Sequence, residues 1–209
     1  MKRFDLSVYL VLDPGLCAGI GMVETARQAV AGGATIVQLR DKDADSARMI
    51  ETGRALKAAL AGSGALLIVN DDVEAARVIG ADGLHVGQGD MTPAEARALV
   101  GPEMLLGLSV ESAALARAAD PAIVDYVGAG PVFATPTKPD HKQPVGWEGL
   151  AAQVAASLVP AVAIGGLKAH HAAQAKAAGA QGVAVVSAIC GQRDPALAAR
   201  EIARAWGAA

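Results

Sequence analysis

The chain has little aromatic surface: only 3% of its 209 residues are Phe, Trp or Tyr, whereas 53% are hydrophobic. A core must therefore be built mainly from Ala, Val, Leu and Ile, which favours helices packed regularly on a sheet. The length fits one domain over residues 1–209, and a domain of this size can bury a substantial core.

Basic residues are not in excess. Lys and Arg number 18 against 21 Asp and Glu, and the net charge is −3. Without a basic stripe, nucleic acid is not expected as a partner. No apolar run reaches the roughly 20 residues that cross a bilayer. Asp13 and Pro14 interrupt the first apolar segment, so we expect neither a signal peptide nor a membrane partner.

Cysteine is scarce, and familiar catalytic clusters are missing. Cys17 and Cys190 are far apart and belong to no motif, which favours a reduced, cytoplasmic protein. Their spacing alone leaves a disulfide between them open. No Cys/His group has metal-ligand spacing, and no Ser-His-Asp arrangement is evident. No Lys lies within a predicted strand, which argues against a Schiff-base aldolase.

Short apolar runs alternate with helical patterns along the whole chain. Strands are predicted at 7–12, 36–39, 66–69, 83–86, 105–108, 125–128, 161–164 and 182–186. Helices are predicted at 21–31, 46–60, 72–79, from 93 onward, and at 112–118, 149–157, 170–178 and 195–206. Ser46 and Thr92 are predicted N-caps, with Pro93 at a first helical position.

About eight strand–helix units predict a single-domain (β/α)8 TIM barrel. An open doubly wound sheet is the alternative. The barrel is favoured because the count reaches eight. In addition, the first strand leads into Asp13-Pro14-Gly15 rather than a glycine-rich turn that cradles a pyrophosphate.

Carboxylates follow two neighbouring strands. The apolar run 66–69 changes abruptly to Asn70, Asp71 and Asp72, and Asp90 follows the next strand. Burying unpaired charge is costly, so such residues are usually presented to a ligand. Two carboxylates at neighbouring strand ends suit Mg²⁺, which prefers oxygen ligands and keeps several waters.

Two anion sites are expected at the same end of the barrel. Arg40 and Lys42 flank Asp41 after the second strand, and cations beside a metal suit a pyrophosphate. The alternative is that residues 40–45 form a solvated, self-neutralising loop. Gly165-Gly166 and the segment 185–188 follow the last two strands, where backbone amides at helix starts commonly bind phosphate.

The long loop 131–146 has the length of a lid or binding loop. Thr135, Thr137 and Lys138 within it can bond phosphate oxygens. By contrast, His85 lies within a strand, and we expect it to point into the core or the barrel interior with a structural role.

Taken together and in order, several segments resemble the thiamine-phosphate synthase family. These are 38–42, 69–72, 83–90, 107–109, 128–138, 164–166 and 185–189. The resemblance implies a (β/α)8 barrel that joins 4-amino-5-hydroxymethyl-2-methylpyrimidine diphosphate to a thiazole phosphate. It implies a dissociative mechanism in which pyrophosphate leaves first. Small phosphorylated molecules would be the partners, and a homodimer is left open.

The resemblance also implies residue roles. Pyrimidine diphosphate would be bound by Gln38, Leu39, Arg40, Asp41, Lys42, Asn70, Ser109 and Lys138, with Arg40, Lys42, Ser109 and Lys138 as the catalytic group. Thiazole phosphate would be bound by Thr135, Pro136, Thr137, Gly166, Val186 and Ser187. Asp71 and Asp90 would ligate the cofactor Mg²⁺.

Two departures and two rival functions remain. Asp41 stands where Glu is common in the family, and Glu111 stands where many members carry His, so Glu111 is given no role. The rivals are a metal-independent thiazole tautomerase on the same barrel and a non-catalytic barrel that binds phosphorylated ligands. The presence of Arg40, Asp71, Asp90 and Lys138 disfavours the tautomerase.

Overall fold

The computed structural model describes residues 4–137 and 142–207. Its strands are β1 (Val8–Val11), β2 (Ile36–Leu39), β3 (Leu66–Asn70), β4 (Gly83–Val86), β5 (Leu105–Val110), β6 (Tyr126–Ala129), β7 (Ala161–Ile164) and β8 (Gly182–Val185). Its helices are α1 (Met22–Ala31), α2 (Ser46–Leu60), α3 (Val73–Ile79), α4 (Pro93–Val100), α5 (Ala113–Ala118), α6 (Gly146–Ala156), α7 (Ala172–Ala177) and α8 (Pro195–Trp206), with a 3₁₀ turn η1 (Ala169–His171) before α7.

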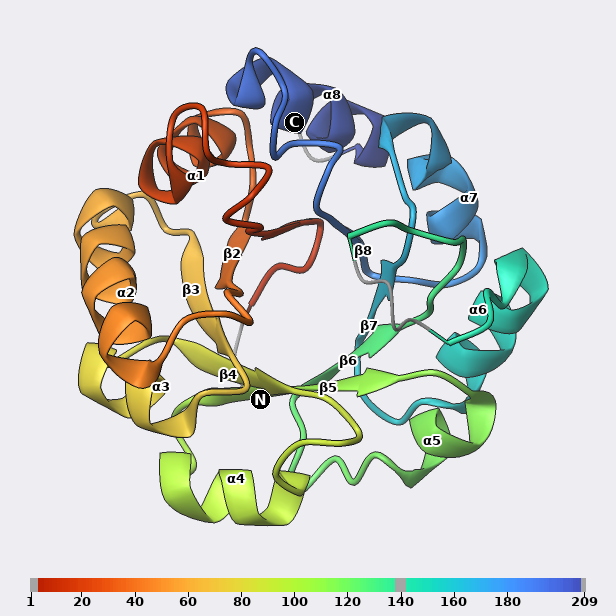
Figure 1. Ribbon diagram of the computed structural model, residues 1–209. Helices are drawn as coiled ribbons and strands as arrows, with labels where there is room; N and C mark the ends of the chain where they lie inside the picture. Colours follow the sequence, from red (N-terminus) through yellow and green to blue (C-terminus); the bar gives the residue numbers. More distant parts are fainter. Residues whose placement is uncertain (1–3, 138–141, 208–209) are drawn as a thin grey trace.

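The strands close into a parallel barrel in chain order, because β1 pairs with both β2 and β8. Figure 1 looks down this barrel, and the helices form a ring around it. The predicted (β/α)8 fold is thus confirmed, and the open doubly wound sheet is excluded.

Successive residues of each strand face opposite sides of the barrel wall and so build two separate apolar layers. Tyr9 and Val11 point into the barrel, whereas Val8 and Leu10 point out toward the helices. The interior cluster consists of Leu6, Tyr9, Val11, Ile36, Ile68, Leu105, Tyr126, Val162 and Ala184. The outer layer holds most of the Ala, Val and Leu side chains, as the composition suggested.

Helix starts agree with the sequence signals where capping is unambiguous. Thr92 and Glu95 form a capping box, with Pro93 in the first turn. Asp45, rather than Ser46, caps α2: its backbone is extended, and its carboxylate accepts from Arg48 N at 2.9 Å. Helix α6 begins at Gly146, three residues before the predicted start at 149.

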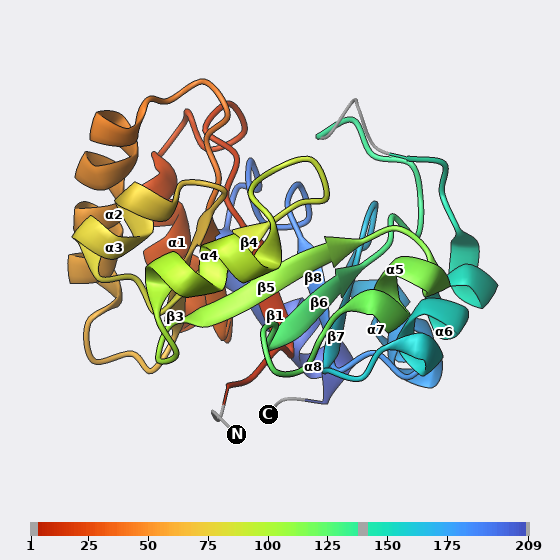
Figure 2. The ribbon, with the colours of Figure 1, turned by 90° about the horizontal axis from the view of Figure 1, so that it is seen from below.

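The loops that follow the strands gather at one end of the barrel. In Figure 2 the loops after β2 and β4 rise on the same side, away from the first and last described residues. This is the end at which barrel enzymes build their sites. In the described chain, no helix combines the length and apolar character required to cross a bilayer.

Candidate active site

A pocket of about 430 Å³ opens at the carboxyl end of the strands. Residues from the ends of all eight strands, or from the loops that follow them, line it. The predicted site residues that line it are Gln38, Arg40, Lys42, Asn70, Asp71, Asp90, Ser109, Thr135, Thr137, Gly166, Val186 and Ser187. Most of the candidate positions therefore share one cavity.

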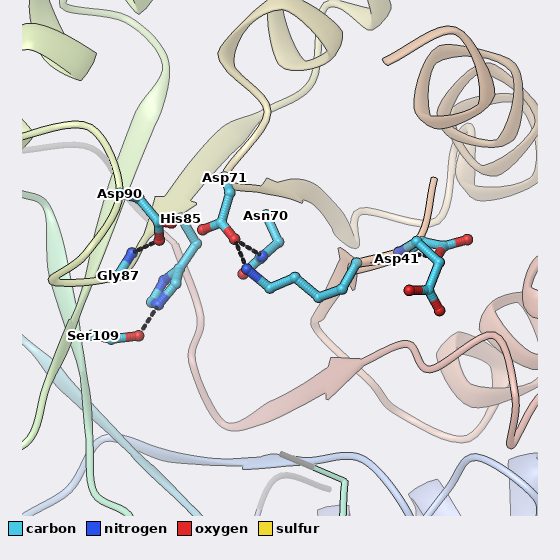
Figure 3. Close-up of polar contacts among 9 residues, drawn as sticks. Asp41, Asn70, Asp71, His85, Gly87, Asp90 and Ser109 are labelled. Atoms are coloured by element: carbon cyan, nitrogen blue, oxygen red, sulfur yellow. Dashed lines mark hydrogen bonds and ion pairs between the residues drawn. The ribbon is translucent and has the colours of Figure 1, made fainter. Parts of the chain in front are cut away.

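Three predicted residues do not line the pocket, and a fourth is not among the described residues. Leu39 is fully buried in the outer layer, because it alternates with the inward-facing Gln38. Asp41 accepts a hydrogen bond from Asp43 N at 3.1 Å and lies apart from Asp71 and Asp90 in Figure 3. Pro136 is exposed and does not line the pocket. Lys138 lies outside the described residues.

The carboxyl groups of Asp71 and Asp90 point toward each other at the pocket (Figure 3). Asp71 accepts from Asn70 Nδ2 at 2.6 Å and forms an ion pair with Lys42. Asp90 accepts from Gly87 N at 2.8 Å. Burial raises the pKa of Asp71, Lys42 opposes that shift, and the neighbouring Asp90 carboxyl adds to it. Bringing these acids together concentrates negative charge that a cation would relieve.

The backbone at Asp71 helps to aim its side chain. Its φ is +63°, in the left-handed region that residues other than glycine seldom adopt. Its N–H donates to His85 O at 2.9 Å, which holds the conformation in place. Such a conformation costs on the order of 1 kcal/mol, a cost typical of functional sites. The next carboxylate, Asp72, plays a different part, because it caps α3 by accepting from Ala75 N.

The donor set at Asp71 and Asp90 fits a hard divalent cation. Two carboxylates that point toward each other supply oxygen ligands, and the pocket leaves room for water and ligand oxygens. Within residues 4–137 and 142–207, no cluster of three or more His, Cys, Asp or Glu side chains forms a metal cage. Mg²⁺ is commonly held by one or two carboxylates plus substrate phosphates, so a pair is sufficient.

A glycine turn follows β7. Gly165 and Gly166 have φ of +106° and +65°. A Cβ on Gly166 would lie 2.8 Å from Ala134 O, and one on Gly165 would lie 2.6 Å from Pro131 Cα. The sequence therefore needs glycine here so that the loop after β6 can pack directly on the turn.

Two backbone bonds fix this packing: Val132 N donates to Ile164 O at 2.9 Å, and Phe133 N donates to Gly165 O at 3.0 Å. The same loop carries Thr135 and Thr137, whose hydroxyls are 2.8 Å apart. The threonines and the glycine turn thus line one pocket, as an anion site requires.

The segment after β8 differs in one respect from the sequence expectation. Ile189 N and Cys190 N both donate to Val186 O, so a single helical turn starts at Val186. Helix α8 begins only at Pro195. Any anion bound beside Ser187 would therefore meet the amides of one turn rather than the start of a long helix.

Sequence reasoning missed part of the pocket lining. Tyr9 and Val11 line the pocket from inside β1, and Gln88 and Lys142 line it from loops. Strand periodicity could have indicated Tyr9, because alternate residues of β1 must face the barrel interior. His85 does point inward, as expected, but it also lines the pocket and contacts Ser109 Oγ at 2.9 Å.

A closed (β/α)8 barrel with a cation-flanked acidic pair and a glycine turn in one pocket defines a class: barrel enzymes that act on small phosphorylated molecules. The family model described as thiamine monophosphate synthase matches residues 8–189. The chain belongs to the thiamine-phosphate synthase family.

Individual relatives agree with this family. A thiamine-phosphate synthase of Xanthobacter autotrophicus is 52% identical over 201 residues, covering 96% of this chain and 95% of the relative. One of Azorhizobium caulinodans is 48% identical, with 95% and 94% covered. A solved structure, thiamine phosphate pyrophosphorylase from Pyrococcus furiosus, superposes with a TM-score of 0.87 at 35% identity, covering 97% of this chain and 96% of that one.

Proposed function

We propose that this protein is a transferase that joins 4-amino-5-hydroxymethyl-2-methylpyrimidine diphosphate to a thiazole phosphate, releasing pyrophosphate. The observation that carries the proposal is that one pocket holds both Arg40 and Lys42 beside an acidic pair and, in addition, the glycine turn at Gly166. Two phosphorylated substrates need two such anion-binding regions in one cavity.

The diphosphate would lie against Arg40 and Lys42, which neutralise charge as the leaving group departs. Asp71 and Asp90 would hold Mg²⁺, and the ion would supply further positive charge to the phosphate oxygens. Lys42 already pairs with Asp71, so the cationic and acidic parts of this region are adjacent. Lys138 remains a predicted contributor from outside the described residues.

The pyrimidine ring would rest on the polar pocket floor. Gln38, Asn70 and Ser109 line this floor and offer hydrogen bonds that orient the ring. An electron-rich aminopyrimidine can carry positive charge at its methylene carbon once pyrophosphate leaves. The thiazole nitrogen then captures that carbon. This route needs no protein nucleophile, so positioning and electrostatics would supply the catalysis.

The thiazole phosphate would bind to the turn at Gly166, the helical turn at Ser187 and the hydroxyls of Thr135 and Thr137. Backbone amides and hydroxyls suit a phosphate monoester because they donate hydrogen bonds without adding net charge. The two phosphorylated groups would then occupy separate parts of the pocket, which orients the two reacting rings.

The test is pyrophosphate release from the two substrates, measured with Mg²⁺ and with a chelator. Turnover that needs both substrates and Mg²⁺ is expected. Thiazole isomerisation that persists in the chelator, without pyrophosphate release, would instead identify a tautomerase. Tight binding of both ligands with no product would identify a non-catalytic binder.

A further inference from the structure

A continuous series of hydrogen-bonded side chains, all buried except the half-buried Ser109, crosses the barrel interior beneath the pocket. Gln38 Nε2 donates to Tyr9 Oη at 2.8 Å, and Tyr9 Oη lies 2.8 Å from Tyr126 Oη. Tyr126 Oη lies 3.1 Å from His85 Nδ1, and His85 Nε2 lies 2.9 Å from Ser109 Oγ. Figure 3 shows the last of these contacts. The chain joins β2, β1, β6, β4 and β5, and both of its ends line the pocket.

The sequence makes room for this chain at one glycine. Gly107 on β5 is in register with His85 on β4 and with Tyr126 on β6. A Cβ at Gly107 would lie 2.2 Å from Tyr126 Cζ and 2.4 Å from His85 Nδ1. Only a residue without a side chain lets the phenol and the imidazole meet across the intervening strand.

The contacts determine which group donates and which accepts in each hydrogen bond of this series. The Gln38 amide nitrogen can only donate, so Tyr9 accepts from it. Tyr9 is buried, and a buried hydroxyl proton needs an acceptor, which its neighbour Tyr126 provides. Tyr126, buried in the same way, then donates to Nδ1 of His85. Burial raises the pKa of both phenols, so both hydroxyls keep the proton they donate.

We propose that Tyr126 is a positioning residue that fixes His85 as the neutral tautomer with its proton on Nε2, so that Ser109 must donate its hydroxyl proton toward the pocket. The hydrogen bond made by one imidazole nitrogen decides which nitrogen carries the proton. With Nδ1 accepting from Tyr126, Nε2 carries the proton and donates to Ser109 Oγ. The hydroxyl proton of Ser109 is then left for a ligand.

A Ser109 hydroxyl that can only donate to the ligand would determine which pyrimidine binds, and this part of the inference rests on the proposed function. A donor at Ser109 matches the ring nitrogen next to the 4-amino group, which is an acceptor. In a 4-oxo pyrimidine the same nitrogen carries a proton and cannot accept. Buried polar groups that lose their partners discriminate strongly between such analogues. Tyr126, which does not line the pocket, would thus set specificity through His85 and Ser109.

The first test uses the free protein and needs no turnover. Nitrogen-15 NMR of labelled wild-type protein, recorded at a pH well above the usual titration range of histidine, should show His85 with a proton on Nε2 and none on Nδ1. The His85→Gln variant assigns the signal. In Tyr126→Phe the two tautomers should become mixed, whereas Tyr9→Phe should keep the wild-type tautomer, because Tyr126 can still donate. Wild-type His85 protonated at Nδ1 would overturn the proposal.

The second test is discrimination between aminopyrimidine diphosphate and its 4-oxo analogue, measured as a ratio of binding constants. Wild type should prefer the amino compound by about 100-fold, and Tyr126→Phe should reduce that ratio at least about tenfold. Thr25→Val is the matched control, since it removes a buried hydroxyl on α1 that donates to the carbonyl oxygen of Gly21, the N-cap of that helix. It should lower stability without changing the ratio.

The outcomes separate the two proposals. If wild type makes product but Tyr126→Phe keeps both the tautomer and the ratio, the positioning role is wrong and the proposed function stands. If wild type makes no product, the proposed function fails, and the tautomer measurement still decides the direction of these hydrogen bonds.

Discussion

Lys42 and Asp71 form an ion pair that joins the loops after two neighbouring strands, β2 and β3. The partner of Asp71 on its other side is the Asp90 carboxyl after β4. A cation proposed to contact the leaving pyrophosphate is thus tied to a carboxylate proposed to ligate the metal. Changes at either residue should therefore affect the binding of metal and diphosphate together.

Removing either acidic charge should abolish most turnover. Asp71→Asn and Asp90→Asn each remove one anionic ligand of the proposed Mg²⁺ site, and we expect kcat/KM to fall by about 100-fold or more. Pyrophosphate release over a range of Mg²⁺ concentrations measures this. Asp72→Asn is the matched control, because asparagine also caps helices and Asp72 caps α3. Wild-type rates for the two site variants at low Mg²⁺ would contradict the assignment.

Ser187 should act on one substrate only. Ser187→Ala removes a hydroxyl at the helical turn after β8, so the KM for thiazole phosphate should rise about three- to tenfold, the value of one hydrogen bond. The KM for pyrimidine diphosphate should stay within about twofold. Steady-state kinetics with each substrate varied in turn makes the comparison. Equal effects on both substrates would argue against two separate anion regions.

Gly166 should be sensitive to a single methyl group. Gly166→Ala forces a Cβ to within 2.8 Å of Ala134 O at a φ of +65°, so the turn or the loop must shift. We expect unfolding free energy to drop by about 1–3 kcal/mol and binding of thiazole phosphate to weaken. Chemical denaturation and titration calorimetry measure the two effects. Unchanged affinity would show that this turn does not hold the phosphate.

Arg97 should affect stability without affecting catalysis. It donates to Asp125 Oδ2 at 2.6 Å, to Met104 O at 2.6 Å and to Gly101 O at 2.7 Å, all away from the pocket. Arg97→Ala breaks a largely buried pair and should cost about 3 kcal/mol.

Arg27→Ala is the control for Arg97, because its pair with Glu24 is exposed and should matter less. Thermal denaturation gives the ranking. At a temperature where both variants are folded, kcat/KM should match wild type. A loss of activity in folded Arg97→Ala would reveal a link to the site that the contacts do not provide.

Strand positions were predictable because each strand is a short apolar run that ends where polar residues or glycines begin. The strands predicted at 36–39, 83–86 and 161–164 have the observed bounds. The convergence of Asp71, Asp90 and Gly166 also followed from the sequence, since all strand ends of a barrel meet at one face.

Contacts across the barrel interior could not be predicted in the same way. Alternation shows that Tyr9 and Tyr126 face inward, but which inward residues touch depends on strand register, which no single strand encodes. The same limit applies to the pairing of Lys42 with Asp71. At α2, Asp45 and Ser46 are both good capping residues, and only the backbone conformation decides between them.

The most direct test of the central claim is a crystal structure with pyrophosphate and Mn²⁺ in place of Mg²⁺, in which anomalous scattering locates the ion. We expect one ion bound by oxygen atoms of both Asp71 and Asp90 at about 2.2 Å, with Arg40 and Lys42 on the pyrophosphate. An ion held by only one of these carboxylates, or bound elsewhere in the pocket, would contradict the account.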